Sequence, residues 1–195
     1  MKSRPVSVEE MEANHVARFK NLTSTGAGNK TEGGPIPKEA YQMMAARTAY
    51  VITAPGDDNS PWDAAPIETP DVVTIIAECE PGEGPSAHMH AKTVETFMAL
   101  TGKWELLWGD DSEHSLILEP FDTIAVPPAV VRTFRNIADE TAYLLVLITG
   151  GTHDMDDLSF RPELGVAVAD KFGADVKKRA EEIGFRFTAG LEGVD

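Results

Sequence analysis

The sequence has little cysteine, few basic residues and no long apolar run. Its one cysteine, Cys79, excludes a disulfide within the chain. This cysteine lies in the run VVTIIAECE, where we expect a buried structural thiol rather than a redox or nucleophilic residue. No segment approaches the roughly 20 apolar residues of a membrane span, and the first residues lack the apolar stretch of a signal peptide. We therefore expect a cytoplasmic protein.

Basic side chains are outnumbered by acidic ones, 17 to 32, which gives a formal net charge of -15. No run rich in Lys or Arg offsets this charge, so we expect no nucleic acid or membrane partner. Internal repeats and low-complexity tracts are also missing. The composition, 42% hydrophobic and 25% charged, is typical of a folded globular chain, and 195 residues favour one domain with extensions.

Helical patterns occur only near the two ends of the chain. Ser7 and Glu10 have the spacing of a capping box, which predicts a helix from about residue 8 to residue 20. Pro37 is suited to the first turn of a second short helix. The stretch GADVKKRAEEIGF predicts a helix that packs outside the central domain through Val176, Ala180 and Ile183.

Between residues 47 and 150 the pattern changes to short β-branched and aromatic runs separated by Gly, Pro and Asp. This pattern predicts an all-β sandwich or barrel. The expected strands are TAYVIT, DVVTIIAEC, TVETFMAL, KWELLW, HSLILE, DTIAVP, VVRTFRN and TAYLLVLIT, and GDDSE predicts a hairpin turn. We expect an N-terminal extension over residues 1–46, a barrel over 47–150 and a C-terminal extension over 151–195.

Two histidines stand one residue apart in CEPGEGPSAHMHAKTVETFMALTGKWEL, residues 79 to 106. Side chains alternate faces in a strand, so His88 and His90 point the same way, with Cα atoms roughly 6.5 to 7 Å apart. Glu95 follows a short turn and can complete a face of two histidines and one carboxylate. Such a triad suits non-haem Fe(II), Mn(II) or Zn(II). A His-X-His pair alone is more often solvent-exposed, so the pair needs further support.

That support comes from the longer spacing: Gly82, five residues, His88-X-His90, four residues, Glu95, six residues and Gly102. The spacing resembles the first conserved motif of the cupin superfamily. The resemblance implies an all-β core, a cupin-type double-stranded β-helix (jelly-roll barrel) with helical N- and C-terminal extensions and an interior site. It also implies that the two histidines and the glutamate hold a divalent metal ion: iron, manganese, nickel or zinc.

The second cupin motif is matched only in part, in LEPFDTIAVPPAVVRTFRN. Pro127 and Asn136 agree with it. Phe121 and Ala129 stand where glycines are usual, and Arg132 stands where the family has its fourth ligand, a histidine.

An arginine cannot ligate a metal, because its guanidinium stays protonated and only donates hydrogen bonds. Three arrangements are open. The metal can remain on His88, His90 and Glu95, with an anionic substrate group between it and Arg132. Arg132 can instead pair with Glu95 in a metal-free pocket. In the third arrangement Arg132 points outward.

Three aromatic residues near this motif are expected to bind a substrate together with Arg132: Phe97, Trp104 and Phe134. Each of them alone can equally fill a core. Trp62 can contribute a lid. Of the remaining histidines, His114 and His153 are expected to be solvated. The acidic run around His153, including Asp154, Asp156 and Asp157, can at most bind cations weakly.

From these residues we expect a metal-dependent, cupin-type enzyme for a small anionic organic molecule. A dioxygenase-like oxidoreductase is the first hypothesis, and an isomerase or lyase is the next. The alternative is a non-catalytic binding or sensing protein, with Arg132 paired to Glu95. Barrels that resemble this one are commonly dimeric, so we also expect a homodimer.

Overall fold

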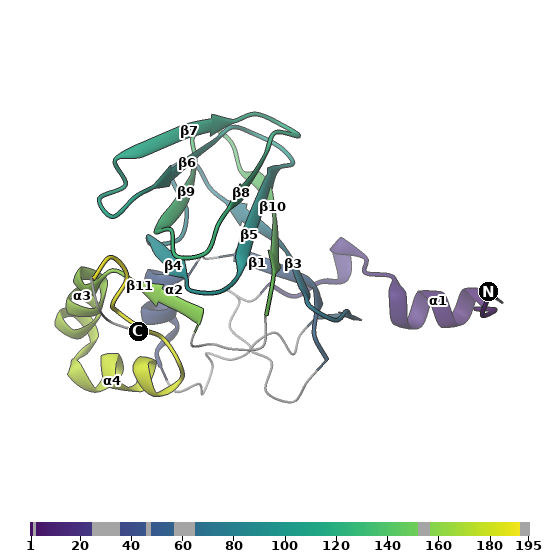
Figure 1. Ribbon diagram of the computed structural model, residues 1–195, viewed down its shortest axis with the longest axis horizontal. Helices are drawn as coiled ribbons and strands as arrows, with labels where there is room; N and C mark the ends of the chain where they lie inside the picture. The colour runs from purple at the N-terminus through teal and green to yellow at the C-terminus, as the bar shows by residue number, and fades with distance from the viewer. Residues whose placement is uncertain (2, 25–35, 46–47, 57–64, 152–156, 192–195) are drawn as a thin grey trace.

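The computed structural model describes residues 1, 3–24, 36–45, 48–56, 65–151 and 157–191. Two β-sheets face each other and form a barrel (Figure 1). In the six-stranded sheet the strand order is β2-β1-β3-β10-β5-β8, and in the five-stranded sheet it is β11-β4-β9-β6-β7. The predicted all-β jelly roll with helical extensions is confirmed.

The strands of the six-stranded sheet are β1 (Thr48–Ala54), β2 (Ile67–Glu68), β3 (Val72–Cys79), β5 (Val94–Ala99), β8 (Thr123–Val126) and β10 (Ala142–Thr149). Those of the five-stranded sheet are β4 (His88–His90), β6 (Trp104–Trp108), β7 (His114–Leu118), β9 (Arg132–Asn136) and β11 (Leu158–Phe160). All eight strands that we expected are present. The hairpin predicted over GDDSE joins β6 to β7, whereas β2 and β11 were not predicted.

The barrel core lies between the sheets because buried and half-buried residues alternate along the strands, most regularly in β3 and β10. Phe97, Trp104 and Phe134 form its aromatic centre, with ring centroids 5.5 and 5.6 Å apart. Cys79 also belongs to this core, and burial raises the pKa of its thiol to about 12. At that pKa the thiol stays protonated, as a structural role requires.

The helices are α1 (Val8–His15), α2 (Lys38–Met44), α3 (Pro162–Phe172) and α4 (Ala174–Glu182), with a 3₁₀ turn, η1, at Phe19–Asn21. The Ser7 side chain caps α1 by accepting a hydrogen bond from the Glu10 amide, as predicted. However, α1 is shorter than expected. It buries no residue, so burial of an apolar face does not stabilise further turns. Within the described ranges, none of the helices is long and apolar enough to cross a bilayer.

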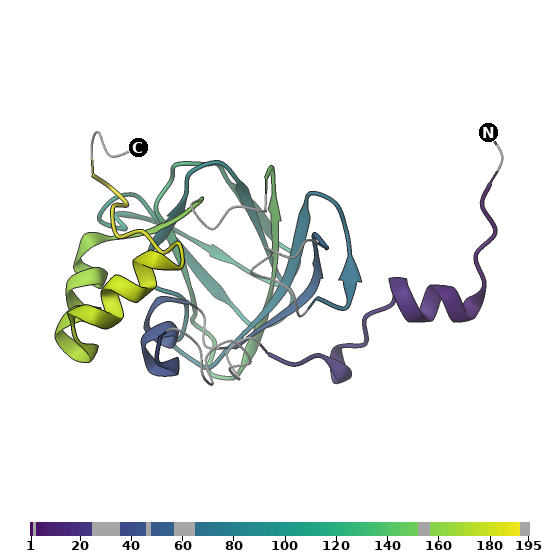
Figure 2. The ribbon, with the colours of Figure 1, turned by 90° about the horizontal axis from the view of Figure 1, so that it is seen from below.

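Helices α2, α3 and α4 lie together on the side of the barrel opposite α1 (Figures 1 and 2). They form a second core, which includes Met44, Phe160, Val168, Val176, Ala180, Phe185 and Phe187. The expected face of α4 is buried at Val176 and Ala180, but Ile183 is exposed. Helix α3 was not predicted. Gly165 lowers its helix propensity, yet a side chain there would collide with Phe187, whose ring lies 2.8 Å from the position of a Cβ.

Two backbone positions support the partial match to the second cupin motif. Phe121 has a φ of 75° and Ala129 a φ of 60°, in the left-handed region that favours glycine. These are the two positions where the motif usually carries glycine. The backbone therefore keeps the conformation of the motif although the side chains depart from it.

Replacing Phe121 by glycine should stabilise the fold. This conformation destabilises the folded protein by about 1–2 kcal/mol when the residue is not glycine. Glycine avoids this strain, but its greater loss of chain entropy on folding costs about 0.5–1 kcal/mol. The ring of Phe121 is exposed, so little packing is lost. We expect Phe121→Gly to raise the free energy of unfolding by about 0.5–1 kcal/mol, measured by chemical denaturation. The control Phe121→Ala removes the ring but keeps the strain, and an equal gain in this control would contradict the explanation.

Candidate metal centre

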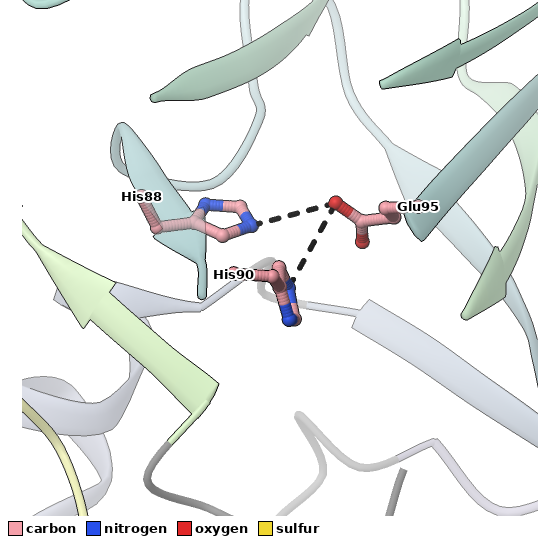
Figure 3. A group of neighbouring side chains, drawn as sticks. All are labelled: His88, His90 and Glu95. Atoms are coloured by element: carbon pink, nitrogen blue, oxygen red, sulfur yellow. Dashed lines mark ion pairs between the residues drawn. The ribbon is translucent and has the colours of Figure 1, made fainter. Parts of the chain in front are cut away.

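The two histidines of the first motif lie on β4, a strand of three residues. Both imidazoles point into the barrel, and Met89 between them lies on the other face. A turn at residues 91–93 carries the chain to β5 in the other sheet, where Glu95 points back toward β4 (Figure 3). The three side chains thus converge as the spacing predicted, from two facing sheets.

The carboxylate oxygen Oε2 of Glu95 lies 3.7 Å from Nε2 of His88 and 3.9 Å from Nε2 of His90 (Figure 3). One ligand atom from each of the three residues lies within 4.8 Å of the others. All three residues are buried, with 6 to 8% of their surface exposed. No other cluster with this capacity to hold a metal occurs among the residues that the structure describes.

The hydrogen bonds of the two Nδ1 atoms assign the histidine tautomers. Nδ1 of His88 lies 2.8 Å from the carbonyl oxygen of Ser86, which can only accept, so this nitrogen carries the proton. Nδ1 of His90 lies 2.8 Å from Oδ2 of Asp157 and is protonated for the same reason. Burial is the main cause that lowers the pKa of His88 below its ordinary value. In neutral imidazoles of this tautomer, Nε2 presents a lone pair toward Glu95.

This arrangement fits a divalent metal ion. Metal ligands bound at about 2.1 Å lie roughly 3.0 to 3.5 Å from one another. The distances of 3.7 and 3.9 Å are slightly longer, so small side-chain rotations would close the triad. The outward hydrogen bonds of both Nδ1 atoms are also typical of metal-binding histidines. The residues that would hold the ion are His88, His90 and Glu95.

Arg132 occupies the fourth corner of the site. Its side chain is 1% exposed, and its Nε and Nη2 atoms lie 2.9 and 2.7 Å from Oε2 of Glu95. The register places Arg132 directly opposite His88 across the β4–β9 pair. The arrangement with Arg132 pointing outward is therefore wrong. The ion pair with Glu95 is present, as the metal-free alternative requires, and it involves the same oxygen that faces both histidines.

The net effect of these neighbours is a strongly acidic Glu95. Burial alone raises the pKa of this carboxyl, but the Arg132 guanidinium beside it lowers the pKa more. The pKa therefore lies well below its usual range. The carboxylate stays ionised at neutral pH, as a metal ligand or an ion-pair partner must be.

Asp157 is part of this site, and sequence analysis missed it. Its carboxylate accepts hydrogen bonds from the His90 ring, the Thr93 hydroxyl and the amides of Lys92 and Thr93. Burial raises the pKa of Asp157, but these hydrogen bonds lower it to about 2 overall. The acidic run around it looked solvated, and nothing local in the sequence connects it to a histidine 67 residues away.

The other residues predicted from the sequence lie outside the triad, some in the barrel core and some on the surface. Phe97, Trp104 and Phe134 are at most 5% exposed and pack against one another in the barrel core, so their contact with a substrate stays a prediction. Trp62 and His153 lie outside the described residues. His114 is exposed beside Glu113, as expected. Asn136 donates to the carbonyls of Cys79 and Glu140, which makes it structural.

The fold is a jelly-roll barrel whose interior carries two histidines and a glutamate that could hold a metal ion. Residues 75–148 match the family model of the cupin domain. The chain therefore contains a cupin domain, and the resemblance seen in the sequence is confirmed. Among curated proteins, none matched the sequence.

Solved structures give distant matches. A structure of the DMSP lyases RdDddP and RnDddQII is 18% identical, with a TM-score of 0.44 over 54% of this chain and 49% of that one. A protein with a double-stranded beta-helix domain from Klebsiella pneumoniae subsp. pneumoniae MGH 78578 is 21% identical, with a TM-score of 0.40 over 44% and 72%. The Schizosaccharomyces pombe Cnp3 cupin domain is 14% identical, with a TM-score of 0.41 over 53% and 66%. The chain thus spans about half the length of the first of these, and the likenesses are too distant to indicate an activity.

The low pKa of Asp157 predicts a specific loss of stability in acid. Its pKa is about 2 in the folded protein, against about 3.9 in an unfolded chain. The contribution of this carboxylate to the free energy of unfolding is therefore complete above about pH 4 and is lost as the pH falls toward about 2. In Asp157→Asn, the free energy of unfolding should fall less steeply over this window than in the wild type, measured by chemical denaturation at a series of pH values.

The matched control is Asp170→Asn, which removes the same charge from an exposed position on α3. This control should keep the wild-type slope. Equal slopes for the wild type and both variants would contradict the assignment of the acid-labile stability to Asp157.

Proposed function

We propose that this protein is a metal-dependent enzyme of the cupin type that acts on a small anionic organic molecule. His88, His90 and Glu95 hold the metal ion, and Arg132 orients the anionic group of the substrate. The metal can be iron, manganese, nickel or zinc. A dioxygenase-like reaction is the first hypothesis, and an isomerase or lyase reaction is the next.

One observation carries the proposal: two histidine lone pairs face the same carboxylate oxygen. Both Nδ1 protons are engaged with acceptors on the outer side, so neither imidazole offers a proton toward Glu95 unless it becomes positively charged. Burial disfavours that charge on His88. Three electron-rich atoms that converge in a buried space repel one another, and a cation among them relieves this repulsion.

The charges of the buried groups support an anionic substrate. Glu95 and Asp157 each contribute one negative charge and Arg132 one positive charge, so the described site carries a net charge of -1 with neutral histidines. A divalent ion would change this to a net charge of +1. A substrate carboxylate or phosphate would restore neutrality, and it would separate the guanidinium from the metal.

The chemistry of the bound metal would be Lewis-acid activation of the substrate or, with iron, activation of oxygen. The residues of the chain would perform the other tasks. Arg132 would bind the anionic group through the nitrogen atoms that now contact Glu95, and the apolar barrel around Phe97 and Phe134 would limit access of water. The same site is compatible with each of the proposed reactions, so reaction class rests on substrate identity.

The proposal predicts that the protein binds a divalent metal through this triad. Protein purified without added metal should contain close to one equivalent of iron, manganese, nickel or zinc, measured by elemental analysis. The double variant His88→Ala, His90→Ala should lose it, because only a single carboxylate ligand remains. The control His114→Ala, at an exposed histidine, should keep it. Wild-type protein that is metal-free and takes up none of these ions would refute the proposed enzyme.

A second candidate function is favoured by the ion pair between Arg132 and Glu95. A buried carboxylate needs a positive partner, and Arg132 supplies it without any metal. The histidines would then be hydrogen-bonding walls of a pocket. The protein would in that case be a non-catalytic module that binds or senses a small molecule.

Arg132→His tests whether Arg132 occupies the position of the fourth ligand. In the metal enzyme this change supplies a fourth ligand and removes a positive charge, so we expect metal affinity to rise at least about tenfold, measured by titration with zinc. Binding of an anionic substrate should weaken. The control Arg135→His lies on the same strand but is exposed, and it should change neither property. If Arg132→His leaves metal affinity unchanged, the ligand assignment at this position is wrong.

The homodimer and the cytoplasmic location stay predictions, as does the division into residues 1–46, 47–150 and 151–195.

A further inference from the structure

We propose that Asp157, from the C-terminal extension, is a positioning residue that holds His90 in the tautomer whose Nε2 faces Glu95 with a lone pair. The consequence of this role for metal binding rests on the proposed function, whereas the effect of Asp157 on the tautomer does not. Asp157 lies outside the matched cupin domain, which covers residues 75–148. The candidate metal centre is therefore completed by a segment that the family motif does not include.

The two oxygens of Asp157 have different partners. Oδ1 accepts hydrogen bonds from the backbone amides of Lys92 and Thr93. Oδ2 lies 2.6 Å from the Thr93 hydroxyl and 2.8 Å from Nδ1 of His90. The side chain is 6% exposed. The two amides orient the carboxylate, and the carboxylate in turn orients the imidazole.

The neighbouring backbone holds this arrangement in place. Strand β11 pairs with β4 in a register that sets Leu158 opposite His90 and Phe160 opposite His88. The amide of Ala91 donates to the carbonyl of Asp157, 2.8 Å away. Asp157 directly precedes this paired strand, so the pairing of β11 with β4 restricts its position beside His90.

An asparagine at this position would invert the effect. The two backbone amides can donate only to an oxygen, so the side-chain carbonyl of the asparagine would take the Oδ1 position. Its NH₂ group would then occupy the Oδ2 position and donate to Nδ1 of His90. The Thr93 hydroxyl, 3.1 Å from the same Nδ1, would lose Oδ2 as its acceptor and could itself donate to Nδ1. The imidazole would then carry its proton on Nε2, where a metal ligand needs a lone pair. Replacing one carboxylate oxygen of Asp157 by an NH₂ group therefore changes the tautomer of His90 without changing the shape of the site.

His88 provides an internal reference for this effect. Its Nδ1 donates to the carbonyl of Ser86, and the Ser86 hydroxyl is hydrogen-bonded to Met43 of α2, 2.7 Å away. None of these contacts involves Asp157. The tautomer of His88 should therefore be unaffected by changes at Asp157.

The experiment is NMR of the imidazole nitrogens in ¹⁵N-histidine-labelled, chelator-treated protein, at a pH where the imidazoles are neutral. The His90 signals are assigned with a His90→Ala variant. In the wild type, Nε2 of His90 should have the chemical shift of an unprotonated nitrogen. In Asp157→Asn the proton should move to Nε2, while His88 stays unchanged. The control Asp170→Asn should match the wild type.

Zinc affinity is measured on the same three proteins. We expect Asp157→Asn to bind zinc about 10- to 100-fold more weakly than the wild type, the size of effect usual for a hydrogen-bond partner of a metal-binding histidine. A tautomer swap with a loss of affinity supports the proposal. A tautomer swap in a protein whose wild type binds no metal supports the positioning role and refutes the metal enzyme.

Two results would overturn the inference. One is a wild-type His90 with its proton on Nε2, which is measured without any variant and so does not depend on whether Asp157→Asn folds. The other is a folded Asp157→Asn variant that keeps both the wild-type tautomer and the wild-type zinc affinity.

Discussion

The burial of the Glu95 carboxylate is the constraint on which the rest of this site depends. An ionised carboxylate taken out of water needs compensating positive charge or hydrogen-bond donors. Arg132 supplies a guanidinium on one side, and the two histidines face the same oxygen with lone pairs on the other. The first interaction stabilises Glu95 in the protein alone. The second leaves a position that a cation could occupy, and the proposed function rests on this position.

The histidines are held by elements that come from both ends of the chain. His88 depends on Ser86, which is hydrogen-bonded to α2 in the N-terminal part, and His90 depends on Asp157 in the C-terminal part. Helices α2, α3 and α4 share one core beside the barrel. The extensions therefore support the two imidazoles of β4, a strand of three residues.

Local patterns in the sequence predicted the strands well, because alternation along a strand and turn residues are local properties, and the cupin resemblance added the jelly-roll barrel. They predicted less outside it. Helix α3 contains Gly165, which lowers helix propensity and is explained only by the nearby ring of Phe187. Helix α1 ends early because it buries no residue, so packing adds little to its stability. Two turns of the second cupin motif, which normally carry glycine, were hard to identify because they carry Phe121 and Ala129 instead. The backbone φ angles show that both turns are kept.

The sequence by itself determined the jelly-roll class and the convergence of His88, His90 and Glu95, because the spacing along β4 and β5 places these side chains on facing walls. It left open where Arg132 points and did not connect Asp157 with His90. The tertiary structure decided both, since an ion pair across two sheets and a carboxylate that reaches a histidine 67 residues away are contacts between distant parts of the chain. Periodicity and spacing describe neighbours along a strand, whereas these contacts exist only after the sheets and the C-terminal extension have packed together.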